Sequence, residues 1–188
     1  MANTSPRTYY NNENYTNLSF ARVIFDAGYD AGVSPYHLAS RIRQEVTKNG
    51  GPSNSVTGTY TGYEGYYNFY NLGASSGSGA IARGLAYAAS ESRIWNTPEK
   101  AIQGGAKEIA VNYIGKGQDT VYLQKFDVDS SDNRLYSHQY QQNIQAPASE
   151  SYKSYQTYLS LGLINQAFNF VIPVYENMPS EISRNAKW

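Results

Sequence analysis

The chain has 188 residues, a length that suits a single domain with a sizeable hydrophobic core. Its 15 basic and 15 acidic residues cancel, which argues against a nucleic-acid or anionic-membrane partner held by bulk charge. No apolar run is long enough to span a bilayer, and the absence of cysteine excludes disulfides, thiolate nucleophiles and zinc–thiolate sites.

The N-terminal part of the chain changes character near residue 16. Residues 1–15 are polar and without period, and we interpret them as an N-terminal arm or a remnant of the expression vector. Residues 16–188 show neither a fixed repeat nor a linker, which predicts one domain. Apolar residues at helical spacing predict a helix over 17–29, with Gly28 and Gly32 marking its end.

A second helix is predicted immediately afterwards, over residues 34–46. Ser34 is a good N-cap, and Pro35 occupies the first helical position, where its missing N–H has no cost. The connection between the two helices is very short, so they must form a hairpin or a corner.

Glu45 has an unexpected position near the end of this second helix. At 3.6 residues per turn it falls on the face of Leu38 and Ile42, about 20° from Leu38. Burial and the negative end of the helix dipole both disfavour a charged carboxylate, so we expect a raised pKa, as a general acid needs at neutral pH. The alternative is a structural carboxylate held on the surface by Arg41, one turn earlier.

The next two segments contrast in composition. Residues 48–62 are rich in Gly, Ser, Thr and Asn, which predicts a loop or a short hairpin. Residues 63–74 combine rings, amides and glycines and are too polar for a core strand. This segment suits the wall of a groove, and the alternative is an irregular loop fixed by its own aromatic residues.

Two further helices are predicted over residues 80–89 and 97–114. The longer of them contains Gly104 and Gly105 in its middle, where each glycine costs about 1 kcal/mol relative to alanine. We therefore predict a close contact or a kink at this point.

The C-terminal third is less regular. Residues 118–128 suggest a short helix followed by an extended piece, and residues 136–144 are again polar and aromatic. A last helix is predicted over 148–161. Residues 168–175 are strand-like, and Pro173 restricts them to a sheet edge or a surface segment.

Tyrosine dominates the aromatic composition, with 19 residues beside 6 Phe and 2 Trp. A ring with a hydroxyl group stacks on the C–H face of a sugar and bonds sugar hydroxyls, so this composition favours a carbohydrate ligand. The alternative is that tyrosine fills half-buried positions of a small polar protein. The two histidines, His37 and His138, are too few for a histidine-rich metal site, and we expect neither a metal nor a cofactor.

Four motifs together resemble the catalytic domain of bacterial endo-β-N-acetylglucosaminidases of glycoside hydrolase family 73, the peptidoglycan autolysins. The resemblance runs from about residue 18 to residue 178. It implies a mainly α (α+β, lysozyme-like) fold, with two helical lobes around a cleft and a small irregular or β-hairpin lobe. The motifs are SPYHLASRIRQE (34–45), YYNFYNLGA (66–74), WNTPEKAIQGGA (95–106) and GQDTVYLQKFDV (117–128).

The resemblance implies that Glu45 is the general acid, the residue that the helical pattern also selects. Family members often carry a second acid on a mobile loop, but the corresponding loop here has no acid before Glu91. Glu64 precedes the aromatic segment, so one alternative is that Glu64 orients or deprotonates water. The other is that the N-acetyl group of the substrate attacks the anomeric carbon. Glu91, beside Arg93, fits a surface charge better.

Three further residues are implied as substrate-binding. Asn68 matches a family asparagine and is expected to brace the catalytic region or to bind an N-acetyl group. Tyr70 is a candidate sugar-stacking ring, and Tyr140 resembles a family tyrosine that faces the cleft. His138 is expected to be structural, because the reaction needs no imidazole.

The resulting hypothesis is a peptidoglycan hydrolase that cleaves the β-1,4 bond between N-acetylglucosamine and N-acetylmuramic acid. The alternatives are a muramidase or lytic transglycosylase of the same fold, or a non-catalytic module that binds wall glycan. We expect a secreted, cell-wall-associated monomer that binds peptidoglycan glycan strands, without a nucleic-acid partner or membrane insertion.

Overall fold

A computed structural model describes residues 19–48, 51–128, 135–140, 143–167, 169, 172, 174–178 and 180–181. The predicted arm over residues 1–15 lies outside this part of the chain. By its internal contacts the chain divides into two units, Met1–Ile144 and Gln145–Trp188, which are considered separately below.

The first unit begins with two helices whose ends follow from the sequence. Helix α1 covers Phe20–Ala31 and ends at Gly32, whose φ of 67° is the left-handed conformation that glycine adopts without strain. Helix α2 covers Pro35–Val46, and its first turn begins from the carbonyl of Ser34. The two predicted helices and their short connection are therefore confirmed.

A minimal hairpin follows α2. Strands β1, Thr47–Lys48, and β2, Gly51–Pro52, pair antiparallel, and a 3₁₀ turn, η1, covers Asn54–Val56. This agrees with the predicted loop or short hairpin over residues 48–62.

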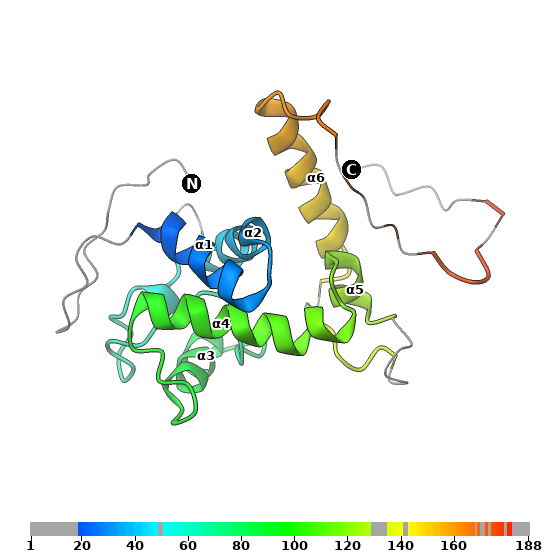
Figure 1. Ribbon diagram of the computed structural model, residues 1–188. Coiled ribbons are helices and arrows are strands. Elements are labelled where there is room, and N and C mark those ends of the chain that lie inside the picture. Colours follow the sequence, from blue (N-terminus) through cyan, green and yellow to red (C-terminus); the bar gives the residue numbers. More distant parts are fainter. Residues whose placement is uncertain are drawn as a thin grey trace. The chain divides into compact units, whose positions relative to one another are not determined.

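Helices α3, Ala80–Ala89, and α4, Pro98–Asn112, follow the aromatic segment. The 3₁₀ turn η2, Ile114–Lys116, and the short helix α5, Val121–Phe126, come after α4. Helix α1 packs against both α2 and α4, which is the arrangement visible in Figure 1.

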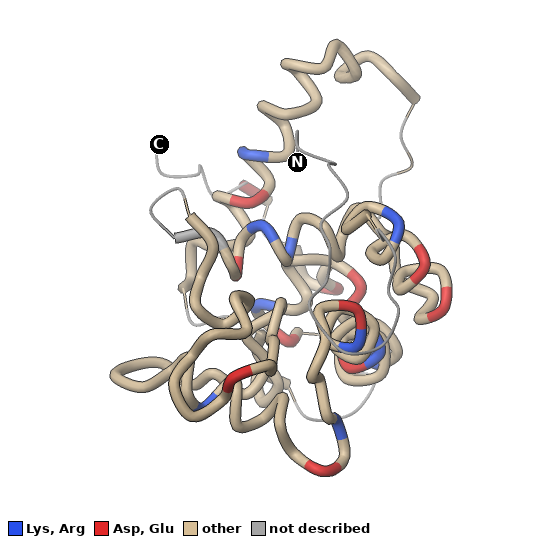
Figure 2. The backbone as a smooth tube through the Cα atoms, turned by 90° about the vertical axis from the view of Figure 1, so that its left-hand side faces the viewer, with Lys and Arg blue, Asp and Glu red and all other residues tan. Residues whose placement is uncertain are grey.

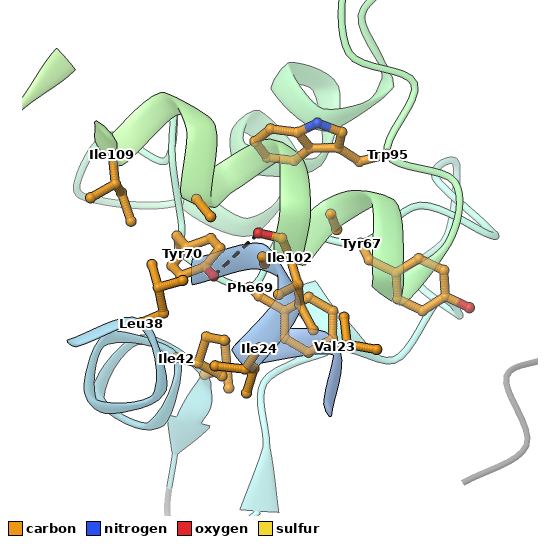
Figure 3. Close-up of a cluster of buried hydrophobic side chains, with 14 of the residues drawn as sticks. Val23, Ile24, Leu38, Ile42, Tyr67, Phe69, Tyr70, Trp95, Ile102 and Ile109 are labelled. Carbon is orange, nitrogen blue, oxygen red and sulfur yellow. Dashed lines mark hydrogen bonds between the residues drawn. The ribbon is translucent and has the colours of Figure 1, made fainter. Parts of the chain in front are cut away.

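The core of this unit explains the mid-helix glycines of α4. A Cβ atom on Gly105 would lie 2.1 Å from the ring of Tyr70, and one on Gly104 would lie 2.2 Å from Nε1 of Trp95. Figure 3 shows both rings beside α4, with the Tyr70 ring near Leu38 of α2 and the Trp95 ring on the side away from Ile24 and Ile42. The glycines therefore allow a close contact between α4 and these two rings. A close contact was one of the two alternatives predicted for this point of the helix, the other being a kink.

The second unit contains helix α6, Ala146–Ser160, close to the predicted range. Half of the strand-like run 168–175 lies outside the described residues, and the other half, residues 169, 172, 174 and 175, is not in a strand. Among the described residues, no helix has the length and apolar character needed to cross a membrane. The fold is mainly α with one small hairpin, as predicted.

Candidate active site

A pocket of about 320 Å³ lies in the first unit, a volume at the lower end of the range for small-ligand sites. It is formed by the end of α2, the second half of the aromatic motif with the residue that follows it, the end of α4, and the segment after α5. Its lining consists of one carboxylate, tyrosines and a turn of small and amide residues: Glu45, Tyr70, Asn71, Leu72, Gly73, Ala74, Ser75, Tyr113 and Tyr140.

Glu45 lies in the last turn of α2, half-buried beside a buried apolar stripe. Leu38 and Ile42 on this stripe are 0% and 7% exposed, so the predicted placement of the carboxylate is confirmed. Arg41, which the alternative placed on the surface together with Glu45, is itself buried, with 2% of its surface exposed. The next residue, Val46, is buried, and its carbonyl accepts a hydrogen bond from the N–H of Ser53.

Asn71 is a site residue that the sequence prediction did not single out. Its Nδ2 donates to the main-chain oxygen of Glu45 at 2.7 Å and to Oε2 of Glu45 at 3.2 Å. Asparagine within a Gly-containing turn signals a left-handed conformation, and φ of Asn71 is indeed 51°. The sequence carries no signal for its contact with a residue 26 positions away.

Asn68 is fully buried, and its contacts match the bracing role rather than a contact with substrate. Its Nδ2 donates to the carbonyls of Leu72 and Gly84, each at 2.8 Å, and its Oδ1 accepts from the N–H of Leu72. Because both amide hydrogens and the oxygen are engaged within the chain, the side chain fixes the turn that carries Asn71.

Tyr70 contributes to the core more than to the surface of the pocket. Its ring is 1% exposed, and its hydroxyl donates to the carbonyl of Ile102, the bond drawn in Figure 3. A buried ring has no free face for a sugar, so the predicted stacking role does not fit this position. Its main-chain oxygen instead accepts a hydrogen bond from the hydroxyl of Tyr140.

Tyr140 and Tyr113 supply the aromatic wall of the pocket. Their rings meet edge to face with centroids 5.1 Å apart, and the guanidinium of Arg41 lies 4.4 Å from the centroid of Tyr140. Arg41 also donates to Oε1 of Gln124 at 2.7 Å. Tyr140, which the family resemblance selected, is thus held in the pocket, whereas Tyr113 was not among the predicted site residues.

A buried amide network holds the segment that carries Tyr140. Nε2 of Gln118 donates to the carbonyl of His138 at 2.9 Å and to Oδ1 of Asp127 at 3.0 Å. Oδ2 of Asp127 accepts from the N–H of His138, whose ring stacks on Tyr113 at 4.4 Å. This agrees with the structural role predicted for His138.

The tyrosines of the pocket are neutral hydrogen-bonding groups. Burial raises the pKa of Tyr140, and the neighbouring charge of Glu45 raises it further. Burial likewise raises the pKa values of Tyr70 and Tyr113. These hydroxyls therefore do not take up a charge near neutral pH.

Glu64 is not brought into the pocket. It is exposed, and both of its carboxylate oxygens accept from the N–H of Gly62, two residues away. The two carboxylates predicted to cooperate thus differ in placement, because Glu64 serves a local turn while Glu45 lines the pocket. Within the described residues, no group of three His, Cys, Asp or Glu side chains is arranged to hold a metal ion.

Comparison with known proteins identifies relatives, although no family model matches the chain. Over 132 residues, or 70% of the chain, it is 30% identical to the bifunctional autolysin of Staphylococcus epidermidis. Over 127 residues it is 33% identical to the β-N-acetylglucosaminidase of Bacillus subtilis. The matched segments span only 9% and 13% of the lengths of these two proteins.

Solved structures agree with these sequence matches. A catalytic mutant of S. aureus autolysin E, in complex with the disaccharide NAG-NAM, aligns with a TM-score of 0.57 and 26% identity. The alignment covers 75% of this chain and 60% of that one. The same enzyme in complex with the muropeptide NAM-L-Ala-D-iGlu aligns with a TM-score of 0.58 and 28% identity over the same shares.

The fold is therefore the mainly α, lysozyme-like fold of these domains, as the motifs predicted. The chain belongs to the family of bacterial autolysin glucosaminidase domains.

Proposed function

We propose that this chain is a peptidoglycan hydrolase that cleaves the β-1,4 bond on the reducing side of N-acetylglucosamine, with Glu45 as the general acid. The observation that carries the proposal is the half-buried carboxylate of Glu45, fixed at a helix end in a tyrosine-lined pocket. The relatives named as glucosaminidase and autolysin, and the autolysin E complexes with NAG-NAM and a muropeptide, support wall glycan as the substrate.

The first step is proton donation to the glycosidic oxygen. Glu45 gives its proton to the leaving oxygen as the bond to the anomeric carbon breaks and positive charge develops on the sugar ring. Among the described residues that line the pocket, Glu45 is the one carboxylate. We therefore favour the N-acetyl oxygen of the substrate as the nucleophile, which forms an oxazolinium ion with the anomeric carbon.

The second step returns the proton. Glu45, now ionised, accepts a proton from water as the water oxygen attacks the anomeric carbon and the oxazolinium ring opens to restore the N-acetyl group. Two displacements at one carbon give net retention of configuration. Proton NMR of the freshly released reducing ends tests this step, and an inverted product excludes substrate assistance.

The proposal is tested by the substitutions Glu45→Gln and Glu64→Gln, assayed on purified cell walls. Glutamine keeps the size of the side chain but carries no transferable proton, so we expect Glu45→Gln to reduce wall hydrolysis at least about a hundredfold. Glu64→Gln, outside the pocket, is expected to retain most of the activity. Circular dichroism of both variants controls for folding.

A Glu45→Gln protein that clears walls at a substantial fraction of the wild-type rate excludes the assigned acid. Loss of activity in Glu64→Gln alone restores the two-carboxylate mechanism that the sequence first suggested. Mass spectrometry of the fragments identifies the bond: N-acetylglucosamine at the reducing end supports the proposal, and a muramic or anhydro-muramic end contradicts it. Binding to walls without fragment release indicates a binding module.

We further propose that the protein acts as a monomer at the cell wall, outside the membrane. The relatives that are named autolysins support the cell wall as the place where the protein acts. Size-exclusion chromatography with light scattering checks the oligomeric state.

A further inference from the structure

One side-chain amide joins the end of helix α2 to the carboxylate that we assign as the acid. The two Nδ2 contacts of Asn71 go to the main-chain oxygen of Glu45, at 2.7 Å, and to Oε2 of Glu45, at 3.2 Å. An amide nitrogen has two hydrogens, so a single group serves both oxygens. The contact therefore ties the glutamate side chain to its own backbone.

The orientation of this amide is determined by its first partner. A main-chain carbonyl oxygen can only accept, so the amide atom that faces it must be the nitrogen and not the oxygen. The same nitrogen faces Oε2, which is consequently an acceptor in every protonation state of Glu45. The carbonyl oxygen of a neutral carboxyl group accepts more strongly than its hydroxyl oxygen, so this contact favours the acid proton on the other oxygen, Oε1.

The backbone around Asn71 is built to hold this amide in place. Its φ of 51° is left-handed, a conformation that asparagine adopts more readily than most other residues. The buried amide of Asn68 fixes Leu72 on one side, and the carbonyl of Asn71 accepts from the N–H of Ala74 at 3.0 Å on the other. The buried side chain of Tyr70, which precedes Asn71, anchors the same turn.

We propose that Asn71 is a positioning residue: it holds Oε2 of Glu45 and so presents the acid proton, carried on Oε1, to the glycosidic oxygen in the pocket. The inference rests on the proposed function, because it assigns a role in the reaction of the same carboxylate. A turn residue without this role would need only the left-handed backbone.

The charge on Glu45 is also sensitive to this contact. A donor to a carboxylate favours its ionised form, so removal of the donor favours the protonated form. Among the described residues, the ionisable groups that line the pocket with Glu45 are Tyr70, Tyr113 and Tyr140, and Arg41 lies one turn earlier on α2. Burial keeps the tyrosines neutral near neutral pH, and all four residues are the same in every variant, so a changed pH profile reports the substituted residue.

Two substitutions separate positioning from turn formation. Asn71→Gly keeps the left-handed backbone and removes the donor, and Asn71→Asp keeps the size and replaces the donor with a like charge. We expect kcat on soluble wall glycan to fall about three- to tenfold in Asn71→Gly with KM within twofold. The alkaline limb of its pH profile should move to higher pH, and further still in Asn71→Asp.

Wild type and Glu45→Gln are measured beside these variants, with urea midpoints as the fold control. If wild type is active, Glu45→Gln is not, and Asn71→Gly matches wild type in kcat and pH profile, the positioning role is overturned while the proposed function stands. A rise in KM with unchanged kcat also overturns it, because that pattern indicates a direct contact with substrate. An inactive wild type, or an active Glu45→Gln, refutes the proposed function itself.

Discussion

His37, on helix α2, illustrates how burial changes the behaviour of a titratable residue. Its Nε2 is buried and has no hydrogen-bond partner among the described residues. Burial, with a smaller contribution from the charge of Arg41, lowers the pKa of His37 from 6.5 to about 4. The ring is therefore neutral in the folded protein at neutral pH, whereas it becomes protonated near pH 6.5 in the unfolded chain.

This difference predicts acid sensitivity. Between pH 6.5 and 4 the unfolded state binds the proton that the folded state excludes, so the free energy of unfolding falls as the pH falls. For this half-buried group we expect the free energy of unfolding to fall by about 2 kcal/mol between pH 6.5 and 4. Above pH 7 the histidine is neutral in both states, so its contribution stays constant. Urea unfolding at each pH measures it.

The matched control is His37→Phe, which keeps a planar ring without a titratable nitrogen. Its free energy of unfolding should decline less than that of wild type between pH 6.5 and 4, and the difference isolates His37 from the carboxylates that titrate below pH 5. Parallel pH profiles for the two proteins contradict the assignment.

In helix α4, a tertiary contact explains an unusual feature of the sequence, the glycines in the middle of the helix. Alanine at an exposed position of a helix interior stabilises it by about 1 kcal/mol relative to glycine. At Gly105 the new Cβ would meet the ring of Tyr70 at 2.1 Å, and this ring cannot move freely because it is buried and hydrogen-bonded to Ile102. Overpacking of this kind outweighs the gain in helix propensity.

We therefore predict that Gly105→Ala lowers the free energy of unfolding by about 1–3 kcal/mol. Lys107→Ala, an exposed substitution on the same helix, should change it by less than about 0.5 kcal/mol. The urea midpoints of the two variants check this expectation. A stabilised Gly105→Ala protein means that the Tyr70 ring and α4 separate easily.

At the scale of the whole molecule, the acidic and basic residues balance in number and are also mixed in position. Figure 2 shows acidic and basic positions interspersed over the described elements. Helix α4, for example, carries Glu99, Lys100, Lys107 and Glu108. This distribution favours a ligand recognised by rings, shape and hydrogen bonds, such as a glycan, over a polyanion recognised by charge.

The division into two units predicts that the second is dispensable for catalysis. Every pocket-lining residue belongs to Met1–Ile144, and the apolar core cluster draws only on residues from Val23 to Ile109. A protein that ends at Ile144 should unfold cooperatively and retain wall hydrolysis within about threefold of the full chain. Loss of cooperative unfolding in urea would instead support the single domain to residue 188 that the sequence suggests.

Local patterns were sufficient to predict most helices. The cap residue Thr97 and the closing glycine Gly32 act within one turn of their own helices, so their effect can be read from the sequence. The placement of Glu45 on a buried stripe follows equally from a 3.6-residue period. The candidate acid was therefore available from the helical pattern, and the family resemblance selected it independently.

Only the tertiary structure decided which residues surround that acid. The family resemblance offers Asn68 and Tyr70 as substrate-binding residues, and the sequence offers Glu64 as a second carboxylate. Folding buries the first two and directs the third to a local turn. Asn71 reaches Glu45 because a left-handed turn is packed against the end of α2, a contact between positions 26 residues apart. The sequence by itself thus determined the helices and the candidate acid, since both depend on short-range periodicity, whereas the neighbours of that residue depend on long-range packing.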